Sequence, residues 1–266
     1  MDHERIAEEA LVQVAKDRSK DIYDDGLKPV VQECGGAVKA IVGLFNNVVL
    51  YPIKKANITY KYKLQQFETD IIDKLKNTSD DKIIEPPINI AGPTLESLRY
   101  TIDVKELREM YLNLLVSSMN IDTTYQAHPS YVEIIRQLTS DEAKILSILP
   151  DVGLQEPIID IISRRPGRNG EFTEFNNVSI LGYEARCQHP DNIPLYINNL
   201  CRLGLVQIPS LGRLVDRWRY GKILDSTYYN NLVKSIPSEF EVGFKQKCLG
   251  ITNYGDIFRK ICLERD

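Results

Sequence analysis

The residue types that carry out catalysis or bind metals are few in this sequence, and they do not cluster. The three histidines, His3, His128 and His189, are too far apart in the sequence to suggest a local acid–base or metal site. Three acids between residues 103 and 109 share one predicted helix, but a two-metal carboxylate site needs matching ligands on further helices. The sequence contains no H-E-x-x-H, G-x-S-x-G or phosphate-loop motif. We therefore predict no catalytic residue, no metal and no cofactor, and expect a protein that is not an enzyme.

Cysteine usage bears on the cellular compartment. The cysteines are odd in number, scattered and never in a C-x-x-C pair, which argues against a disulfide framework and against a thiolate metal site. The N-terminal residues are polar and acidic, unlike a secretory signal. We expect a cytoplasmic protein. The five positions are Cys34, Cys187, Cys201, Cys248 and Cys262.

The most unusual segment of the sequence is residues 34–67, which contain five lysines and no acid. Residues 35–53 within it are largely apolar, which leaves three interpretations: a buried helix, an element lying at the membrane interface, or a membrane span. The basic residues would suit an anionic leaflet, so we predict contact with the inner membrane surface or another anionic partner. The candidate contact residues are Lys39, Lys54, Lys55, Lys61 and Lys63.

The sequence pattern predicts a mainly α protein, with a helical N-terminal domain over residues 1–138 and a winged-helix-like α+β domain over residues 139–266. Apolar residues recur at helical intervals in residues 56–77, 103–119 and 128–138. The acidic residues 1–25 are also predicted to form a helix.

The second domain is predicted to begin with a helix capped by Thr139 and Glu142, because the T-x-x-E spacing matches a capping box. We predict an apolar helix over residues 157–163 and a longer helix over residues 191–203. Gly204 is predicted to end that helix before a short strand.

Alternating apolar residues from position 240 predict a strand, a polar tip at residues 245–247 and a returning strand at residues 249–252. A closing helix is predicted to follow from Thr252 or Asn253. Helices followed by a β-hairpin and a last helix resemble a winged-helix domain, and the insertion at about residues 209–237 departs from that pattern.

Because winged-helix domains place a helix in the DNA major groove, nucleic-acid binding is one predicted function of this domain. Residues 140–266 contain 16 basic and 16 acidic side chains, however, so the domain lacks the basic footprint typical of such binders. The alternative is a protein-interaction module. The candidate nucleic-acid contacts are Asn198, Asn199, Arg202, Arg217, Trp218, Arg219, Lys245 and Lys247.

Several stretches in order resemble the abortive-infection alpha (Abi-alpha) family of bacteria, from about residue 27 through the C-terminal half. They are Lys28-Pro29-Val30, residues 43–46, residues 50–57, Glu85-Pro86-Pro87, Ala91-Gly92-Pro93, residues 106–111 with Leu114-Leu115, and residues 128–135 with Leu138 and Asp141.

The resemblance implies a bacterial protein of phage defence that acts through arrest or death of the infected cell, and it supplies no catalytic residues. We predict a non-enzymatic protein that works through contacts with proteins, with copies of itself or with the membrane surface. The alternative is a winged-helix nucleic-acid-binding regulator.

Overall fold

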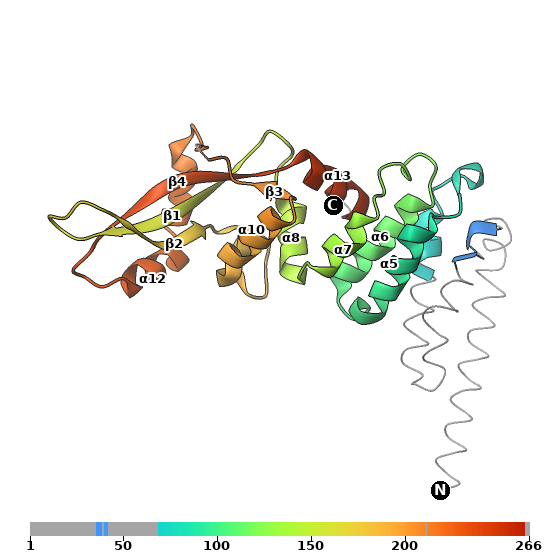
Figure 1. The fold of residues 1–266 in the computed structure, drawn as a ribbon, viewed down its shortest axis with the longest axis horizontal. Coiled ribbons are helices and arrows are strands. Elements are labelled where there is room, and N and C mark those ends of the chain that lie inside the picture. The colour runs from blue at the N-terminus through green and yellow to red at the C-terminus, as the bar shows by residue number, and fades with distance from the viewer. Residues whose placement is uncertain (1–35, 39, 42–68, 211, 264–266) are drawn as a thin grey trace, which may run out of the picture. The chain divides into compact units, whose positions relative to one another are not determined.

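The computed structural model describes residues 36–38, 40–41, 69–210 and 212–263 (Figure 1). By its internal contacts the chain divides into two compact units. The first comprises residues 1–99 and 115–125, and the second comprises residues 100–114 and 126–266. The domain boundary predicted at residue 138 stays a prediction.

The described part of the first unit is helical. Residues 69–75 form a helix, as predicted, and bury Ile71, Ile72 and Leu75. A 3-10 helix, η4 (Asp80–Lys82), is followed by a strand-like bridge between Ile83 and Asn120. Helix α5 (Ile88–Thr101) follows, and Pro93 lies inside it.

The apolar segment at residues 35–53 is described only at residues 36–38 and 40–41, which are helical. Ala37, Val38 and Ile41 are buried there, which favours the buried-helix interpretation for these five residues. None of the helices in the part of the chain that the structure describes has the length and hydrophobicity to span a membrane. The helix predicted over residues 1–25 lies outside the described residues.

The predicted helices around residues 103–149 are confirmed. Helix α6 (Lys105–Ser118), α7 (Ser130–Arg136) and α8 (Ser140–Ile148) all lie where apolar periodicity placed them. The Thr139 side chain accepts a hydrogen bond from the Glu142 backbone N–H, and the Glu142 carboxylate accepts one from the Thr139 backbone N–H. This capping box fixes the first turn of α8.

The apolar helix predicted over residues 157–163 is wrong. This segment is strand β1 (Glu156–Arg164), paired antiparallel with β2 (Phe172–Val178). Its β-branched residues Ile158, Ile159, Ile161 and Ile162 are all buried, so both faces of the strand are covered and no alternation appears in the sequence.

The hairpin predicted over residues 240–252 is also wrong, because these residues form one long strand, β4 (Glu241–Ile251). Lys245 and Lys247 are not a turn. They lie in the ladder opposite Asp160 and Ile158 of β1. Asp160 lies opposite Lys245, and this pair of opposite charges helps the polar residues 245–247 to continue the strand.

The second unit is α+β and has one four-stranded antiparallel sheet in the order β2-β1-β4-β3 among its described residues (Figure 1). Strand β3 (Val206–Gln207) confirms the predicted short strand, and Gly204 before it has a positive φ of 73°. That φ suits glycine and ends helix α10 (Ile193–Arg202).

The connections of the sheet are helical. Helix α9 (Leu181–Glu184) and η5 (Pro190–Asn192) lead from β2 into α10. Between β3 and β4, the predicted insertion contains η6 (Arg217–Tyr220), α11 (Gly221–Leu224) and α12 (Thr227–Ser235).

Helix α13 (Asn253–Cys262) confirms the predicted closing helix, and the Thr252 hydroxyl caps it by accepting from the Gly255 backbone N–H at 2.9 Å. The start of α13 lies very close to the chain before β3. A Cβ at Gly255 would lie 2.0 Å from the carbonyl oxygen of Leu205. Only glycine permits this approach.

We expect Gly255→Ala to lower the free energy of unfolding by about 1–3 kcal/mol, because the added methyl group forces backbone to move. Urea unfolding measures this change. Gly221→Ala is the matched control, since its Cβ would have its nearest neighbour at 3.9 Å, and we expect a change within about 0.5 kcal/mol. Equal stability of the two variants would contradict the close approach.

Candidate functional site

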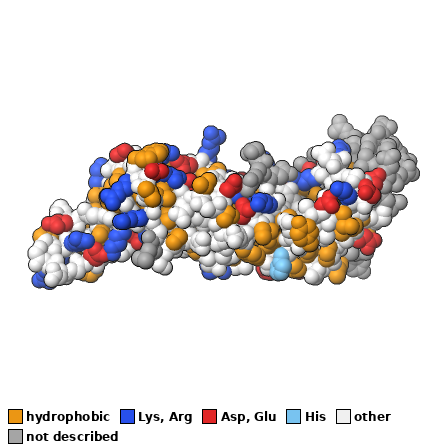
Figure 2. Space-filling view, turned by 90° about the horizontal axis from the view of Figure 1, so that it is seen from above, with side chains coloured by type: hydrophobic (Ala, Val, Ile, Leu, Met, Phe, Trp, Pro, Cys, Tyr) orange, Lys and Arg blue, Asp and Glu red, His pale blue; other side chains and the backbone are white. Residues whose placement is uncertain are grey.

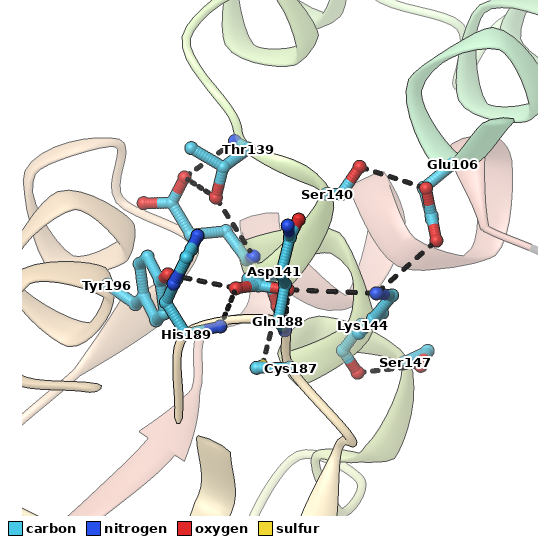
Figure 3. Close-up of polar contacts among 11 residues, drawn as sticks. Glu106, Thr139, Ser140, Asp141, Lys144, Ser147, Cys187, Gln188, His189 and Tyr196 are labelled. Carbon is cyan, nitrogen blue, oxygen red and sulfur yellow. Dashed lines mark hydrogen bonds and ion pairs between the residues drawn. The ribbon is translucent and has the colours of Figure 1, made fainter. Parts of the chain in front are cut away.

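A buried carboxylate, that of Asp141, lies in the first turn of α8 (Figure 3). It is 4% exposed. One oxygen accepts a hydrogen bond from the backbone N–H of Gln188 at 2.8 Å. The other accepts from the backbone N–H of His189 at 3.0 Å and from the hydroxyl of Tyr196 at 2.9 Å. The carboxylate thus joins α8 to the loop after α9 and to α10.

A lysine connects this carboxylate to α6. The Lys144 ammonium lies 3.6 Å from a carboxylate oxygen of Asp141 and 3.6 Å from one of Glu106, and the Ser140 hydroxyl donates to Glu106 at 2.9 Å (Figure 3). We call this set the Asp141 cluster: Glu106, Ser140, Asp141, Lys144 and Tyr196, with the backbone N–H groups of Gln188 and His189.

Both acids of the Asp141 cluster are held in the charged form. Burial raises the pKa of Asp141, but the hydrogen bonds from the two backbone N–H groups and from Tyr196 outweigh it, so the pKa lies below its ordinary value. Burial also opposes ionisation of Glu106, and hydrogen bonds from its own backbone N–H and from Ser140, with the charge of Lys144, lower its pKa. Burial and the bond to Asp141 raise the pKa of Tyr196 to about 12.

A cavity of about 370 Å³ adjoins the cluster between α6, α8 and the end of α13. Two lysines and two glutamates face it together with apolar and amide groups, so its charges are balanced. The charged lining residues are Lys105, Glu106, Glu109 and Lys144. A cavity of this size suits a small polar molecule.

Two described thiols, one beside Asp141 and one at the cavity, are held in the protonated form. The Cys187 thiol lies 3.6 Å from the Asp141 carbonyl oxygen, and burial raises its pKa to about 11. Burial also raises the pKa of the Cys262 thiol well above its usual range. A protonated thiol is a weak nucleophile. In residues 69–210 and 212–263, no group of three or more His, Cys, Asp or Glu side chains could hold a metal ion.

Three predicted nucleic-acid contacts on α10 are engaged within the protein. The Asn198 amide oxygen accepts from the Asn177 side chain at 2.9 Å. The Asn199 amide donates to the Glu142 carboxylate at 2.7 Å, and Arg202 donates to the Asn199 amide oxygen at 2.6 Å. These bonds tie α10 to its neighbours.

Three more predicted contacts pair with acids. The Lys247 ammonium lies 3.0 Å from Asp160 and 2.6 Å from the amide oxygen of Asn177. Lys245 pairs with Glu171, and Arg219 lies 3.0 Å from Glu156. Lys247 and Asn198 are therefore brought together through Asn177.

Trp218 and Arg217 are exposed, Trp218 to 72%, as are Asn198, Arg202 and Lys245. Unlike those three, Trp218 and Arg217 have no ion pair or side-chain hydrogen bond among the described residues. The five lysines predicted to contact an anionic partner, Lys39, Lys54, Lys55, Lys61 and Lys63, lie outside the described residues.

Sequence reasoning missed the loop between β1 and β2, which carries two arginines. Pro166-Gly167 and Asn169-Gly170 are turn signals, and Gly167 and Gly170 have positive φ values of 72° and 121°. These dipeptides after an isoleucine-rich run could have identified the hairpin. The arginines are Arg165 and Arg168.

The second unit is thus an α+β unit with a buried aspartate, Asp141, and with ion pairs at Lys245, Lys247 and Arg219. The chain belongs to the abortive infection alpha family, whose model matches residues 59–262. The predicted family resemblance is confirmed.

Two further comparisons add little. A search of curated proteins found no match. A solved structure of an uncharacterized protein from the hydrocarbon-degrading marine bacterium Alcanivorax borkumensis SK2 is similar at 20% identity, over 53% of this chain and 94% of that one. Its TM-score of 0.31 is too low to support an argument about fold or function.

We expect Asp141→Asn to lower the free energy of unfolding by about 1.5–3 kcal/mol at pH 7, because three donors lose a charged acceptor. The folded pKa of Asp141 is lowered, so its contribution is present above the unfolded pKa of about 4 and is lost as the pH falls through the folded pKa. Urea unfolding at pH 7 and at about pH 3 should show the difference shrinking in acid.

Asp216→Asn is the control for this prediction, because it removes the same charge from an exposed side chain. A loss that persists undiminished in acid would mean that the charge of Asp141 is not the source of its contribution.

Proposed function

We propose that this chain is a non-enzymatic abortive-infection protein of phage defence that acts through contacts with other macromolecules. Membership of the family supports the biological role. The observation that favours contact over catalysis is the state of the Asp141 cluster, whose acids are held ionised by fixed donors and by Lys144. A general acid or base works best with a pKa near the working pH, and these two carboxyl groups are shifted away from it.

A test of this proposal is protection from phage by a double variant, Glu106→Gln with Lys144→Met, expressed in bacteria. The variant removes the cluster's acid–base groups at the cavity. The two side chains are 31% and 32% exposed, so losing their ion pair costs at most about 1 kcal/mol. We expect full protection, measured by plaque counts and by survival of the culture at high phage dose.

Lys105→Met with Glu109→Gln is the matched control, because these residues line the same cavity outside the cluster. Thermal unfolding confirms that both variants fold. If the cluster variant is folded and loses protection while the control keeps it, the site performs chemistry and the proposal is wrong.

The membrane surface is one partner in this proposal, supported by the absence of acids in residues 34–67. A lysine near an anionic leaflet contributes about 1 kcal/mol of attraction. We expect Lys54, Lys55, Lys61 and Lys63 replaced by glutamine to abolish salt-sensitive co-sedimentation with anionic liposomes. Neutral liposomes are the control. If the variant binds anionic liposomes as the wild type does, these lysines do not mediate membrane binding.

A second candidate function is a winged-helix regulator that binds nucleic acid. It is supported by the presence in one unit of helices α8, α9 and α10 and of the antiparallel strands β1, β4 and β3, and by the long β3–β4 connection in the place of a wing. Because the polar side chains Asn198 and Asn199 of α10 bond within the protein, contact would come from that connection instead.

A further inference from the structure

Trp218, the one tryptophan in the sequence, is held at the surface by a fixed turn. Next to it in η6, Tyr220 is 1% exposed, and its hydroxyl donates to the Lys247 carbonyl oxygen at 2.8 Å and accepts from the Leu214 backbone N–H at 2.9 Å. Arg219 donates to the Gln155 carbonyl oxygen at 2.9 Å. These bonds anchor η6 to the sheet. They fix the backbone position of Trp218, so its exposed indole offers a flat face at a defined place on the surface.

A cavity of about 170 Å³ lies beside the indole. It is smaller than the range of about 300–1,000 Å³ typical of sites for drug-sized ligands, and so accommodates one ring system. Its lining combines Trp218 with two ion pairs, Lys222 with Glu184 at 3.4 Å and Arg219 with Glu156 at 3.0 Å. Such a lining offers donors and acceptors to the polar edge of a planar ring.

Positive charge surrounds this position. Within the described residues, Arg213 and Arg217 are exposed and have no ion-pair partner, and the Lys222 side chain is 66% exposed. Arg213 lies near the same turn, because the backbone N–H of the adjacent Leu214 donates to the Tyr220 hydroxyl. Figure 2 shows Lys and Arg side chains beside hydrophobic ones on the part of the second unit that carries the sheet.

We propose that the Trp218 surface, formed by Arg213, Arg217, Trp218 and Lys222, binds single-stranded nucleic acid. One base stacks on the indole at the cavity, and the cations contact the phosphates on either side. The inference rests on the proposed function and deepens it, because it names a partner class for the contact surface. A single strand is favoured because bases inside a duplex are already stacked and do not reach a surface indole.

The neighbouring side chains favour nucleic acid over a protein partner. A protein interface has an apolar centre, but between Arg213 and Lys222 the one exposed large apolar residue besides Trp218 is Val215. The other exposed residues of this segment are charged. From Arg213 to Lys222 the chain contains four basic residues and one acid, Asp216, in contrast to the balance of charge over residues 140–266.

Tryptophan fluorescence of the full chain tests the proposal, because the signal comes from this site alone. Titration with 20-nucleotide oligo(dT) and oligo(U) should quench the emission saturably, and binding should weaken as salt rises. A duplex of equal length should quench much less. The proposal is overturned if neither oligo(dT) nor oligo(U) quenches the emission. It is also overturned if anionic liposomes quench the emission and neither oligonucleotide does.

Variants make the test specific. With anisotropy of a labelled oligonucleotide as readout, Trp218→Ala should weaken binding about 5- to 150-fold, the range for loss of one stacked base. Arg213→Gln with Arg217→Gln should weaken binding and flatten its salt dependence. Arg168→Gln, an exposed arginine in the β1–β2 loop, is the control and should bind as the wild type does.

Unchanged affinity of Trp218→Ala would refute the stacking site even if oligonucleotides bind elsewhere. Both variants change surface side chains, and thermal unfolding checks that they fold. Binding is measured without phage, so failure here leaves the protection assay with the Glu106 and Lys144 variant to decide the proposed function on its own.

Discussion

The carboxylate of Asp141 imposes the main constraint on the second unit. A charge buried this deeply is tolerated only where fixed donors replace water, and here the donors are two backbone N–H groups and a hydroxyl. Those groups belong to the loop after α9 and to α10, while Lys144 reaches α6 through Glu106. One acid therefore joins several elements, and the groups that stabilise it also hold its pKa below the ordinary value.

Other buried charges follow the same pattern. The Arg259 guanidinium is 3% exposed and pairs with Asp256 at 2.8 Å and Asp151 at 3.0 Å. Lys247 is satisfied by Asp160 and by Asn177, whose positive φ of 53° is held by a backbone bond to the same aspartate. Among the described residues, Arg213 and Arg217 have no such acid partner, and they lie in the same segment as the exposed indole of Trp218.

Local signals in the sequence were sufficient where a few neighbouring residues decide the structure. The T-x-x-E spacing at Thr139 and the glycine at position 204 predicted a helix start and a helix end correctly. The strand at residues 156–164 was missed because a short apolar run suits a buried strand and a buried helix equally. The Asp141 cluster could not be predicted, since its donors lie about 50 positions away and are mostly backbone groups.

Strand β4 has a consequence for how the protein is made. It supplies the partner for β1 along residues 241–249 and for β3 at residues 250–251, yet more than 70 residues separate it from β1. On the ribosome, the centre of the sheet therefore stays open until β4 has emerged, and pairing over such separations is slow. The turn that presents Trp218 is bonded to β4 through Tyr220, so it is completed only at that late stage. A chain synthesised only as far as β3 therefore lacks the strand to which this turn is bonded.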